Sequence, residues 1–223
     1  PIYYALVVTE EDAFRQRLEI RLPEGSAPDV HVIDLRLHLT RIALDENAAE
    51  GANVVVVEWL SMQNPRRAFT RARPRLPGQR FPGTGFGRDV AQLLVLMCRR
   101  IRRDGLVVVP ERFHLAELYA NAGWRAASPH ADRDLHDVRA AAARLTFAAR
   151  AWAVERGFVV DERGAPYVYA PAERILPVSD ALADALAPGV FQPPRRYVVD
   201  VDGLRESLAN DAVEGMDLDD VNV

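Results

Sequence analysis

The chain has 223 residues, of which 49% are hydrophobic and 27% charged, and its formal net charge is −4. This composition is that of a folded globular protein and excludes a chain that is disordered throughout. No run approaches the roughly 18 consecutive apolar residues that cross a bilayer, and no basic segment followed by an apolar run marks a signal peptide. We therefore expect a cytoplasmic protein without a membrane partner.

Lysine is absent, and all 28 basic residues are arginine. The chain thus has no lysine for a Schiff base, for general base catalysis or for binding a phosphate. This excludes Walker-type nucleotide-binding proteins, protein kinases and pyridoxal-phosphate enzymes, all of which need that residue. Cys98 is the only cysteine, so an intramolecular disulfide and a cysteine-rich metal site are excluded as well.

The first 60 residues have the pattern of β-strands. Residues 2–8 form an apolar run, and residues 18–22 and 30–35 alternate apolar with polar side chains around the turn-rich segment 23–28. This alternation predicts a β-hairpin. Residues 53–60 are apolar on both faces, which is typical of a central strand covered on both sides.

The middle of the chain predicts a β-α-β-α unit. Residues 61–87 are rich in proline and glycine, and a loop of this length inside a compact domain usually has a function. An apolar helix is expected over 88–104, a buried strand over 106–110 and a second helix over 112–122, closed by a glycine.

Residues 132–156 predict one long, alanine-rich helix. Three large apolar side chains on this helix are spaced seven residues apart: Val138, Leu145 and Trp152. We expect this face to be buried against the sheet or against a second subunit of a homodimer. A further helix is expected near 179–186. Residues 210–223 contain five acidic residues and no basic one, which predicts a frayed or mobile tail.

The segment between the central strand and the first helix contains the candidate ligand-binding residues. Its glycines, at positions 83, 85 and 87, place backbone amides at a helix N-terminus, where phosphate and pyrophosphate groups bind. No acidic residue lies between Glu58 and Asp89, whereas seven arginines do: Arg66, Arg67, Arg71, Arg73, Arg75, Arg80 and Arg88. This local charge favours an anionic ligand.

The pattern Arg80-x-x-Gly83-x-Gly85, followed by Gly87, resembles the acyl-CoA-binding loop of the GNAT acyltransferase superfamily. It does not fit the G-x-G-x-x-G spacing of a Rossmann dinucleotide site. The stretch Leu118-Tyr-Ala-Asn-Ala-Gly-Trp124 resembles a second GNAT signature, in which Leu-Tyr precedes a glycine and an aromatic residue. Together the two motifs give a resemblance over residues 53–127.

The resemblance implies acetyl-CoA or another acyl-CoA as a substrate, threaded between splayed parallel strands at 53–60 and 106–110. The residues that would bind it are Arg80, Gly83, Thr84, Gly85, Phe86, Gly87 and Arg88. Tyr119 matches the family's frequent general acid, which protonates the leaving thiolate. Glu58, near the end of the central strand, is our candidate base, and a strand-end carboxylate paired with an arginine is the alternative interpretation.

Other ligands have less support in the sequence. The chain has five histidines: His31, His38, His114, His130 and His136. No two of them have the spacing of zinc ligands, so we predict no metal site. The isoelectric point near 5.8 and the scarcity of aromatic residues beside the arginines argue against a nucleic-acid-binding protein. Cys98 is expected to be an inert core residue.

We therefore expect an α+β fold with a mixed, mostly antiparallel sheet. Residues 1–130 would form a GNAT-like acyl-CoA-binding domain, and residues 131–223 a partly helical extension packed on it. The leading function is transfer of an acyl group from CoA to a small-molecule or peptide amine. One alternative is a catalytically silent module that binds acyl-CoA or another phosphate ligand. It is favoured because residues 15–40 predict a hairpin where GNAT domains place acceptor-binding helices. The other is an N-acyl amino acid synthase-like enzyme that uses acyl carrier protein.

Overall fold

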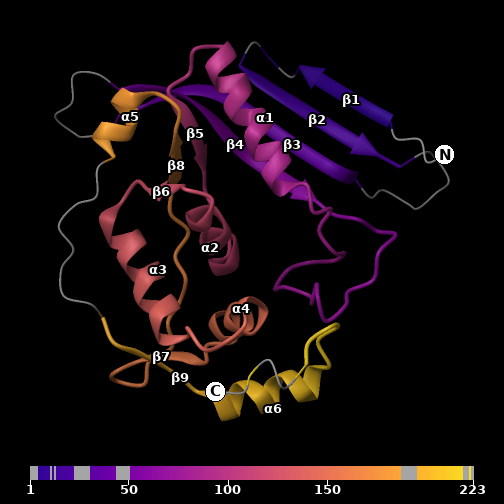
Figure 1. Cartoon of the computed structure of the whole chain (residues 1–223), viewed down its shortest axis with the longest axis vertical. Coiled ribbons are helices and arrows are strands. Elements are labelled where there is room, and N and C mark those ends of the chain that lie inside the picture. Colours follow the sequence, from indigo (N-terminus) through magenta and orange to yellow (C-terminus); the bar gives the residue numbers. More distant parts are fainter. Residues whose placement is uncertain are drawn as a thin grey trace. The chain divides into compact units, whose positions relative to one another are not determined.

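The computed structural model describes residues 5–10, 12, 14–22, 31–43, 51–186, 195–217 and 221. These residues fall into two compact units, each of which is described by itself (Figure 1). Unit 1 comprises residues 1–67, 83–109 and 174–187, and unit 2 comprises residues 68–82, 110–173 and 188–223. The units interleave along the sequence, so residue 130 lies inside a continuous segment of unit 2.

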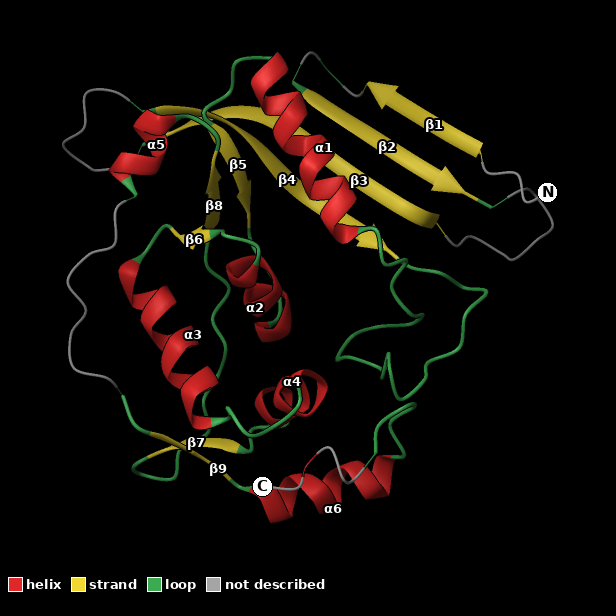
Figure 2. Ribbon diagram, in the orientation of Figure 1, coloured by secondary structure: helices red, strands yellow, loops and turns green. Residues whose placement is uncertain are grey.

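Unit 1 is built on a β-sheet (Figure 2). Its strands are β1 (Ala5–Glu10), β2 (Arg15–Arg21), β3 (His31–Ile42), β4 (Ala52–Met62), β5 (Gly105–Val108) and β8 (Arg174–Pro177). Within the unit they lie in the order β1-β2-β3-β4-β5-β8, and β4 and β5 are parallel whereas the other neighbours are antiparallel. The predicted α+β class with a mixed, mostly antiparallel sheet is confirmed.

The predicted hairpin is the antiparallel pair β2–β3, and the turn at 23–28 lies outside the described residues. On its other side β3 pairs with β4, and the register shifts there by one residue. Arg36 faces Trp59 while the next residue, Leu37, faces Val57, so Glu58 is the extra residue of a β-bulge. A bulge bends its strand and changes the direction of the bulged side chain.

The described residues of unit 1 form two helices: α1 (Gly87–Arg100), between β4 and β5, and α5 (Asp180–Ala185), after β8. α1 crosses one face of the sheet (Figure 2). The buried cluster that includes Leu182 of α5 consists of small and branched side chains: Ala52, Val54, Val107, Ile175 and Leu182. Leu94 and Cys98 are the buried residues of α1, and all four residues of β5 are buried.

Unit 2 is mainly helical. Its helices are α2 (Phe113–Asn121), α3 (Pro129–Ala141), α4 (Phe147–Glu155) and α6 (Val201–Asp211), and its strands are β6 (Arg125–Ala126), β7 (Val159–Asp161) and β9 (Tyr197–Val199). β7 and β9 pair with each other antiparallel. The buried faces of all four helices share one hydrophobic cluster. No helix among the described residues is long and apolar enough to cross a membrane.

The single helix predicted over 132–156 is wrong, because α3 ends at Ala141 and α4 begins at Phe147. The Thr146 side chain caps α4 by accepting a hydrogen bond from the Ala149 amide at 3.3 Å. The Arg150 guanidinium donates to the carbonyl oxygens of Ala142 and Leu145, which satisfies backbone acceptors between α3 and α4. Val138 and Leu145 are buried in the cluster of unit 2, and Trp152 is partly buried against it. This face therefore packs within the mainly helical unit 2, whereas the prediction named the sheet or a second subunit as its partner.

The mobile tail predicted over 210–223 is also wrong for the part that the structure describes. α6 continues to Asp211, and the Glu214 carbonyl accepts a hydrogen bond from the Arg75 amide at 2.9 Å. Val221 is fully buried in the cluster of unit 2. Acidic composition alone therefore misled the prediction, because basic residues of the same unit supply partners for this segment.

Candidate functional site

The glycine-rich segment of unit 1 leads from β4 into α1. Gly83 forms an isolated β-bridge with Gln63, directly after β4. Gly85 has φ +89°, a left-handed conformation that glycine adopts without strain. Thr84 is buried, and its hydroxyl accepts a hydrogen bond from the Phe86 amide at 3.3 Å. These contacts fix the turn in which α1 begins.

The backbone amides at the start of α1 face solvent. Residues 85–89 are all exposed, and the first amides of a helix have no acceptor within the helix. The Phe86 amide is already bonded to Thr84, so the amides of Gly87, Arg88 and Asp89 are the donors that an anion could reach. The positive end of the helix dipole favours such an anion, and the Asp89 carboxylate in the same turn opposes it.

The two arginines predicted to contact the ligand lie in different units. Arg88 is exposed in the first turn of α1, in unit 1. Arg80 is exposed in unit 2, and its guanidinium lies 5.2 Å from the centre of the Phe81 ring.

The parallel strands β4 and β5 stop pairing partway along β4. Their pairs run from Val54↔Gly105 to Val57↔Val108. β4 then continues to Met62 while it pairs with β3 on its other side, and the bulge at Glu58 comes directly after the last parallel pair. The pairing ends at Val108 because β5 ends there, and β4 continues past it with the bulge.

Glu58 is accessible and has a charged partner. Its side chain is 36% exposed, and its Oε1 lies 2.8 Å from Nδ1 of His38 and 4.0 Å from Nε of Arg15. The contact with His38 is close but lacks hydrogen-bond geometry. Glu58 thus has an arginine partner, Arg15, as the alternative interpretation of a paired strand-end carboxylate expects. It also has the exposed surface that a general base needs.

Tyr119 lies in α2, in unit 2, whereas Glu58 and the glycine-rich segment lie in unit 1. Its ring packs edge-on against Trp124, with ring centres 5.0 Å apart. Burial raises the pKa of the Tyr119 hydroxyl above its ordinary value of 10.0, so the group stays protonated at neutral pH. A proton donor is thus present, in the protonation state that the predicted role requires.

The Leu-Tyr-x-x-x-Gly-Trp motif also has a structural explanation. The Trp124 amide donates to the Tyr119 carbonyl at 3.0 Å, and the Gly123 amide donates to the Ala120 carbonyl at 3.1 Å. Gly123 has φ +89°, and these two bonds form the Schellman motif that ends many helices. The spacing therefore fixes the end of α2 whether or not Tyr119 acts in catalysis.

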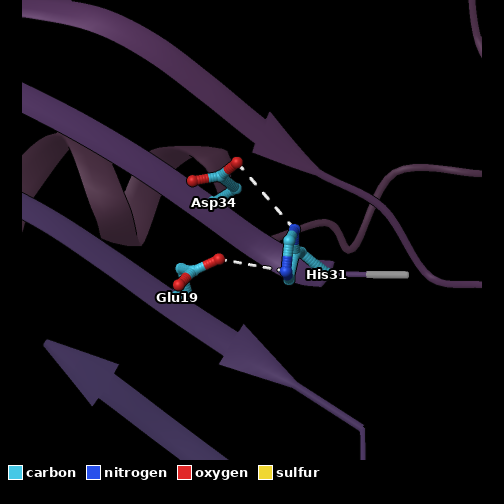
Figure 3. A group of neighbouring side chains, drawn as sticks. All are labelled: Glu19, His31 and Asp34. Atoms are coloured by element: carbon cyan, nitrogen blue, oxygen red, sulfur yellow. Dashed lines mark ion pairs between the residues drawn. The ribbon is translucent and has the colours of Figure 1, made fainter. Parts of the chain in front are cut away.

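A charged cluster that sequence analysis missed lies on β2 and β3 (Figure 3). Glu19 and Asp34 are buried and directly opposite each other in the strand register. His31 lies between them, with Nε2 3.0 Å from a Glu19 oxygen and Nδ1 3.9 Å from an Asp34 oxygen. Ile33 pairs with Met62, and the end of the Met62 side chain lies beside α1, 3.6 Å from where a Cβ on Gly87 would be.

Ile33 and Met62 therefore lie on the face of the sheet that α1 covers. Because successive side chains of a strand point to opposite faces, Asp34 and the cluster lie on the other face.

Three arginines neutralise these carboxylates. Arg17 donates two hydrogen bonds to Asp34, both of 3.0 Å, and Arg21 donates two to Glu19, of 2.9 and 2.8 Å. Burial would raise the pKa of Asp34, but the hydrogen bond and charge of Arg17, with the charges of Arg36 and His31, hold it below its ordinary value. A metal ion here would meet these guanidinium groups, so the cluster is an ion network of the sheet.

Two buried side chains, Cys98 and His114, are not candidates for a catalytic role. Cys98 is fully buried with Sγ 3.7 Å from the Gly105 carbonyl oxygen, and burial raises the pKa of its thiol to about 11. The thiol is therefore unreactive at neutral pH. His114 is buried in α2, and burial, with the charge of Arg112, lowers its pKa to about 4. Both groups act as packing residues.

A surface hollow of about 620 Å³ lies in unit 2. Its lining includes the rings of Tyr167 and Tyr197, which pack edge-on with centres 5.4 Å apart, and the charged residues Asp134, Arg163 and Arg195. None of the predicted site residues lines it. Sequence analysis gave no signal for this hollow, because its walls come from separate segments.

Comparison with known proteins gave no match: no family model matches the chain, and no curated protein or solved structure matches it. A proposal about function therefore depends on the geometry above and on the motifs in residues 53–127.

Proposed function

We propose that the chain binds an acyl-CoA and transfers its acyl group to an amine. The observation that carries this proposal is the end of β4–β5 pairing at Val57 and Val108, next to the bulged carboxylate of Glu58. A glycine-rich turn and exposed helix amides lie in the same unit. This combination would offer an extended thioester the edge of β4 beyond the end of β5 and would offer its phosphates backbone donors.

The anionic end of the substrate would bind to the amides of Gly87, Arg88 and Asp89. Gly85 keeps the preceding turn open for close approach, since its positive φ disfavours any residue with a Cβ. The guanidinium of Arg88 adds a charge-assisted contact from the same turn. The resemblance assigns a second such contact to Arg80.

In the chemical step the amine nitrogen attacks the thioester carbon, and the carbon–sulfur bond breaks. Glu58 accepts the proton that the amine loses, and Tyr119 gives a proton to the departing thiolate. His38, 2.8 Å from Glu58, positions the carboxylate. Transfer is direct, so most of the rate enhancement would come from positioning the two reactants.

A binding module without turnover is the second candidate. It is favoured by the Schellman motif, which explains the Tyr119 and Gly123 spacing without catalysis, and by the hairpin β2–β3 at the place of acceptor-binding helices. The enzyme requires acyl-CoA binding, the binding module binds acyl-CoA or another phosphate ligand, and only the enzyme turns its ligand over. An enzyme that takes its acyl group from acyl carrier protein stays a third proposal.

Calorimetric titration with acetyl-CoA and with palmitoyl-CoA tests the binding of acyl-CoA. We expect binding to the wild-type chain, and loss of binding in Gly85→Val. Gly164→Val is the matched control, because Gly164 has a similar φ of +79° with no atom within 4 Å of an added Cβ. Absence of binding at millimolar ligand, or equal loss in the two variants, would refute the proposal.

A second pair of variants tests the arginine contact. Arg80→Gln should weaken CoA binding by about 1–3 kcal/mol, the size of a charge-assisted hydrogen bond. Arg163→Gln, which removes one exposed positive charge elsewhere in unit 2, should leave the affinity unchanged. If both variants bind equally well, the pyrophosphate does not contact Arg80.

A further inference from the structure

The arginine-rich segment and the acidic C-terminal segment are bound to each other in unit 2. We name residues 68–80 the arginine segment and residues 213–217, which follow α6, the acidic segment (Figure 1). The Arg75 amide donates to the Glu214 carbonyl at 2.9 Å. The Arg75 carbonyl accepts a 2.8 Å hydrogen bond from the Trp152 indole, so both backbone groups of this residue are fixed.

The two backbones approach each other closely. Thr70 and Arg73 close a turn with reciprocal backbone hydrogen bonds of 3.1 and 2.8 Å. Gly215 lies against this turn with φ +76°, and a Cβ there would be 2.6 Å from the Thr70 carbonyl oxygen. A glycine is thus required at this point, both by the φ angle and by the space.

Opposite charges line the contact. Arg71 Nη1 lies 3.0 Å from an Asp217 oxygen, and Arg75 Nη1 lies 3.9 Å from a Glu214 oxygen. The side chains of Arg71 and Glu214 are 68% and 62% exposed. Ion pairs as exposed as these are weak and readily exchanged for other partners.

The acidic segment neutralises the arginine segment only in part. Four arginines and no acidic residue lie within residues 68–80: Arg71, Arg73, Arg75 and Arg80. Among the residues that the structure describes, no carboxylate lies within ion-pair distance of Arg73 or Arg80. Within the described part of the chain, Arg73 and Arg80 therefore remain without a carboxylate partner, while the acidic segment binds another part of the arginine segment.

We propose that the arginine segment is a docking surface for an acidic polypeptide segment of a partner protein, and that residues 213–217 occupy part of this surface in the free chain. The occupant follows from charge complementarity and from the bound acidic segment, which shows that peptide backbone and carboxylates fit here together. The proposal does not depend on acyl transfer, and an acidic partner displaces Glu214 and Asp217.

Fluorescence anisotropy with a fluorescein-labelled octaglutamate peptide tests this at 50 mM salt. The double variant Glu214→Gln, Asp217→Asn should bind about three- to tenfold more tightly than wild type, the combined size of two exposed ion pairs. The double variant Asp202→Asn, Glu206→Gln has the same change of net charge on exposed positions of α6 and should bind as wild type. Equal tightening in both would overturn the proposal.

A pair of uncharged variants tests displacement separately. In Gly215→Ala the added Cβ pushes the acidic segment away from Thr70, so this variant should also bind the peptide more tightly. Gly164→Ala is the control, because Gly164 has a similar φ and open space around it, and this variant should bind as wild type. Arg71→Gln with Arg75→Gln should weaken binding at least tenfold. Unfolding temperatures within a few degrees of wild type show that each variant is folded.

Three results overturn the proposal. One is no peptide binding by any variant at millimolar concentration, and another is a Gly215→Ala variant that binds the peptide as wild type does. The third is tighter binding of a single-stranded octanucleotide than of octaglutamate at equal salt, which would assign the surface to nucleic acid.

Discussion

The carboxylate of Glu58 lies 2.8 Å from the imidazole of His38, across the bulge that ends the parallel pairing of β4 with β5. If Glu58 is the base, Glu58→Gln keeps the size of the side chain but cannot accept the proton. We expect kcat to fall about 10²–10⁴-fold, the usual contribution of a positioned base, with unchanged acyl-CoA affinity. The measurement is thiol release from the bound acyl-CoA in the presence of a mixture of amino acids and polyamines.

Glu10→Gln is the control for this prediction. Glu10 is exposed on β1 of the same sheet, and the variant has the same change of charge. Its turnover should equal that of wild type. If Glu58→Gln is as active as Glu10→Gln, then Glu58 is not the base and has only a structural role, through its contacts with His38 and Arg15.

Tyr119→Phe separates the enzyme from the silent binding module. Phenylalanine keeps the edge-on contact with Trp124, so the fold and the acyl-CoA affinity should stay unchanged. Loss of the hydroxyl should lower turnover by about 10²–10⁴-fold if it protonates the thiolate. Turnover is followed by thiol release, and binding by calorimetry.

Tyr169→Phe provides the comparison for Tyr119. The Tyr169 hydroxyl donates a 3.0 Å hydrogen bond to the Pro110 carbonyl, so its loss should change stability and not turnover. Full activity in Tyr119→Phe would show that Tyr119 only packs. In that case the Schellman motif is the whole explanation of its spacing.

Much of unit 1 could be predicted from the sequence because its signals are local. The alternation in residues 18–22 and 30–35 identifies the hairpin, and the apolar run at 53–60 identifies the central strand. The bulge at Glu58 was not predictable, since it arises from the register between β3 and β4. The charged cluster had a visible signal, because every second residue of β2 is charged: Arg15, Arg17, Glu19 and Arg21.

The two errors in unit 2 come from partners that are distant in sequence. Alanine-rich residues 132–156 have high helix propensity, but Glu117 holds the Arg150 guanidinium where it bonds the carbonyls between α3 and α4. The acidic segment has no local apolar pattern, and its order comes from the arginine segment more than 130 residues earlier. Composition and periodicity contain no information on such pairs.

Gly105 has no room for a side chain. A Cβ at this position would lie 2.7 Å from the Leu176 carbonyl oxygen and 2.6 Å from Leu182 Cδ2. Gly105→Ala should therefore destabilise the protein by about 1–3 kcal/mol, the usual cost of overpacking a core. Urea unfolding measures the difference, and Gly83→Ala is the control, because its Cβ would be 3.7 Å from the nearest atom. Equal stability of the two variants would mean that β5 and β8 can move apart.

His114 should make the stability depend on pH. Burial, and then the charge of Arg112, lowers its pKa to about 4 from the ordinary 6.5, while Glu155 acts in the opposite direction. Between these two values the unfolded chain binds a proton that the folded chain excludes, so stability falls as the pH decreases from about 6.5 towards 4. From pH 7 to pH 5 this one group should lower the free energy of unfolding by about 2 kcal/mol.

The variant His114→Gln tests this because glutamine does not titrate. Its stability at pH 7 should be lower than that of wild type, since a neutral, well-packed imidazole is lost, but the further loss between pH 7 and pH 5 should be smaller by about 2 kcal/mol. Urea unfolding at both pH values gives the four free energies, and the contributions of carboxylates common to both proteins cancel in the difference. A variant with the same pH dependence as wild type would show that His114 can be protonated within the folded α2.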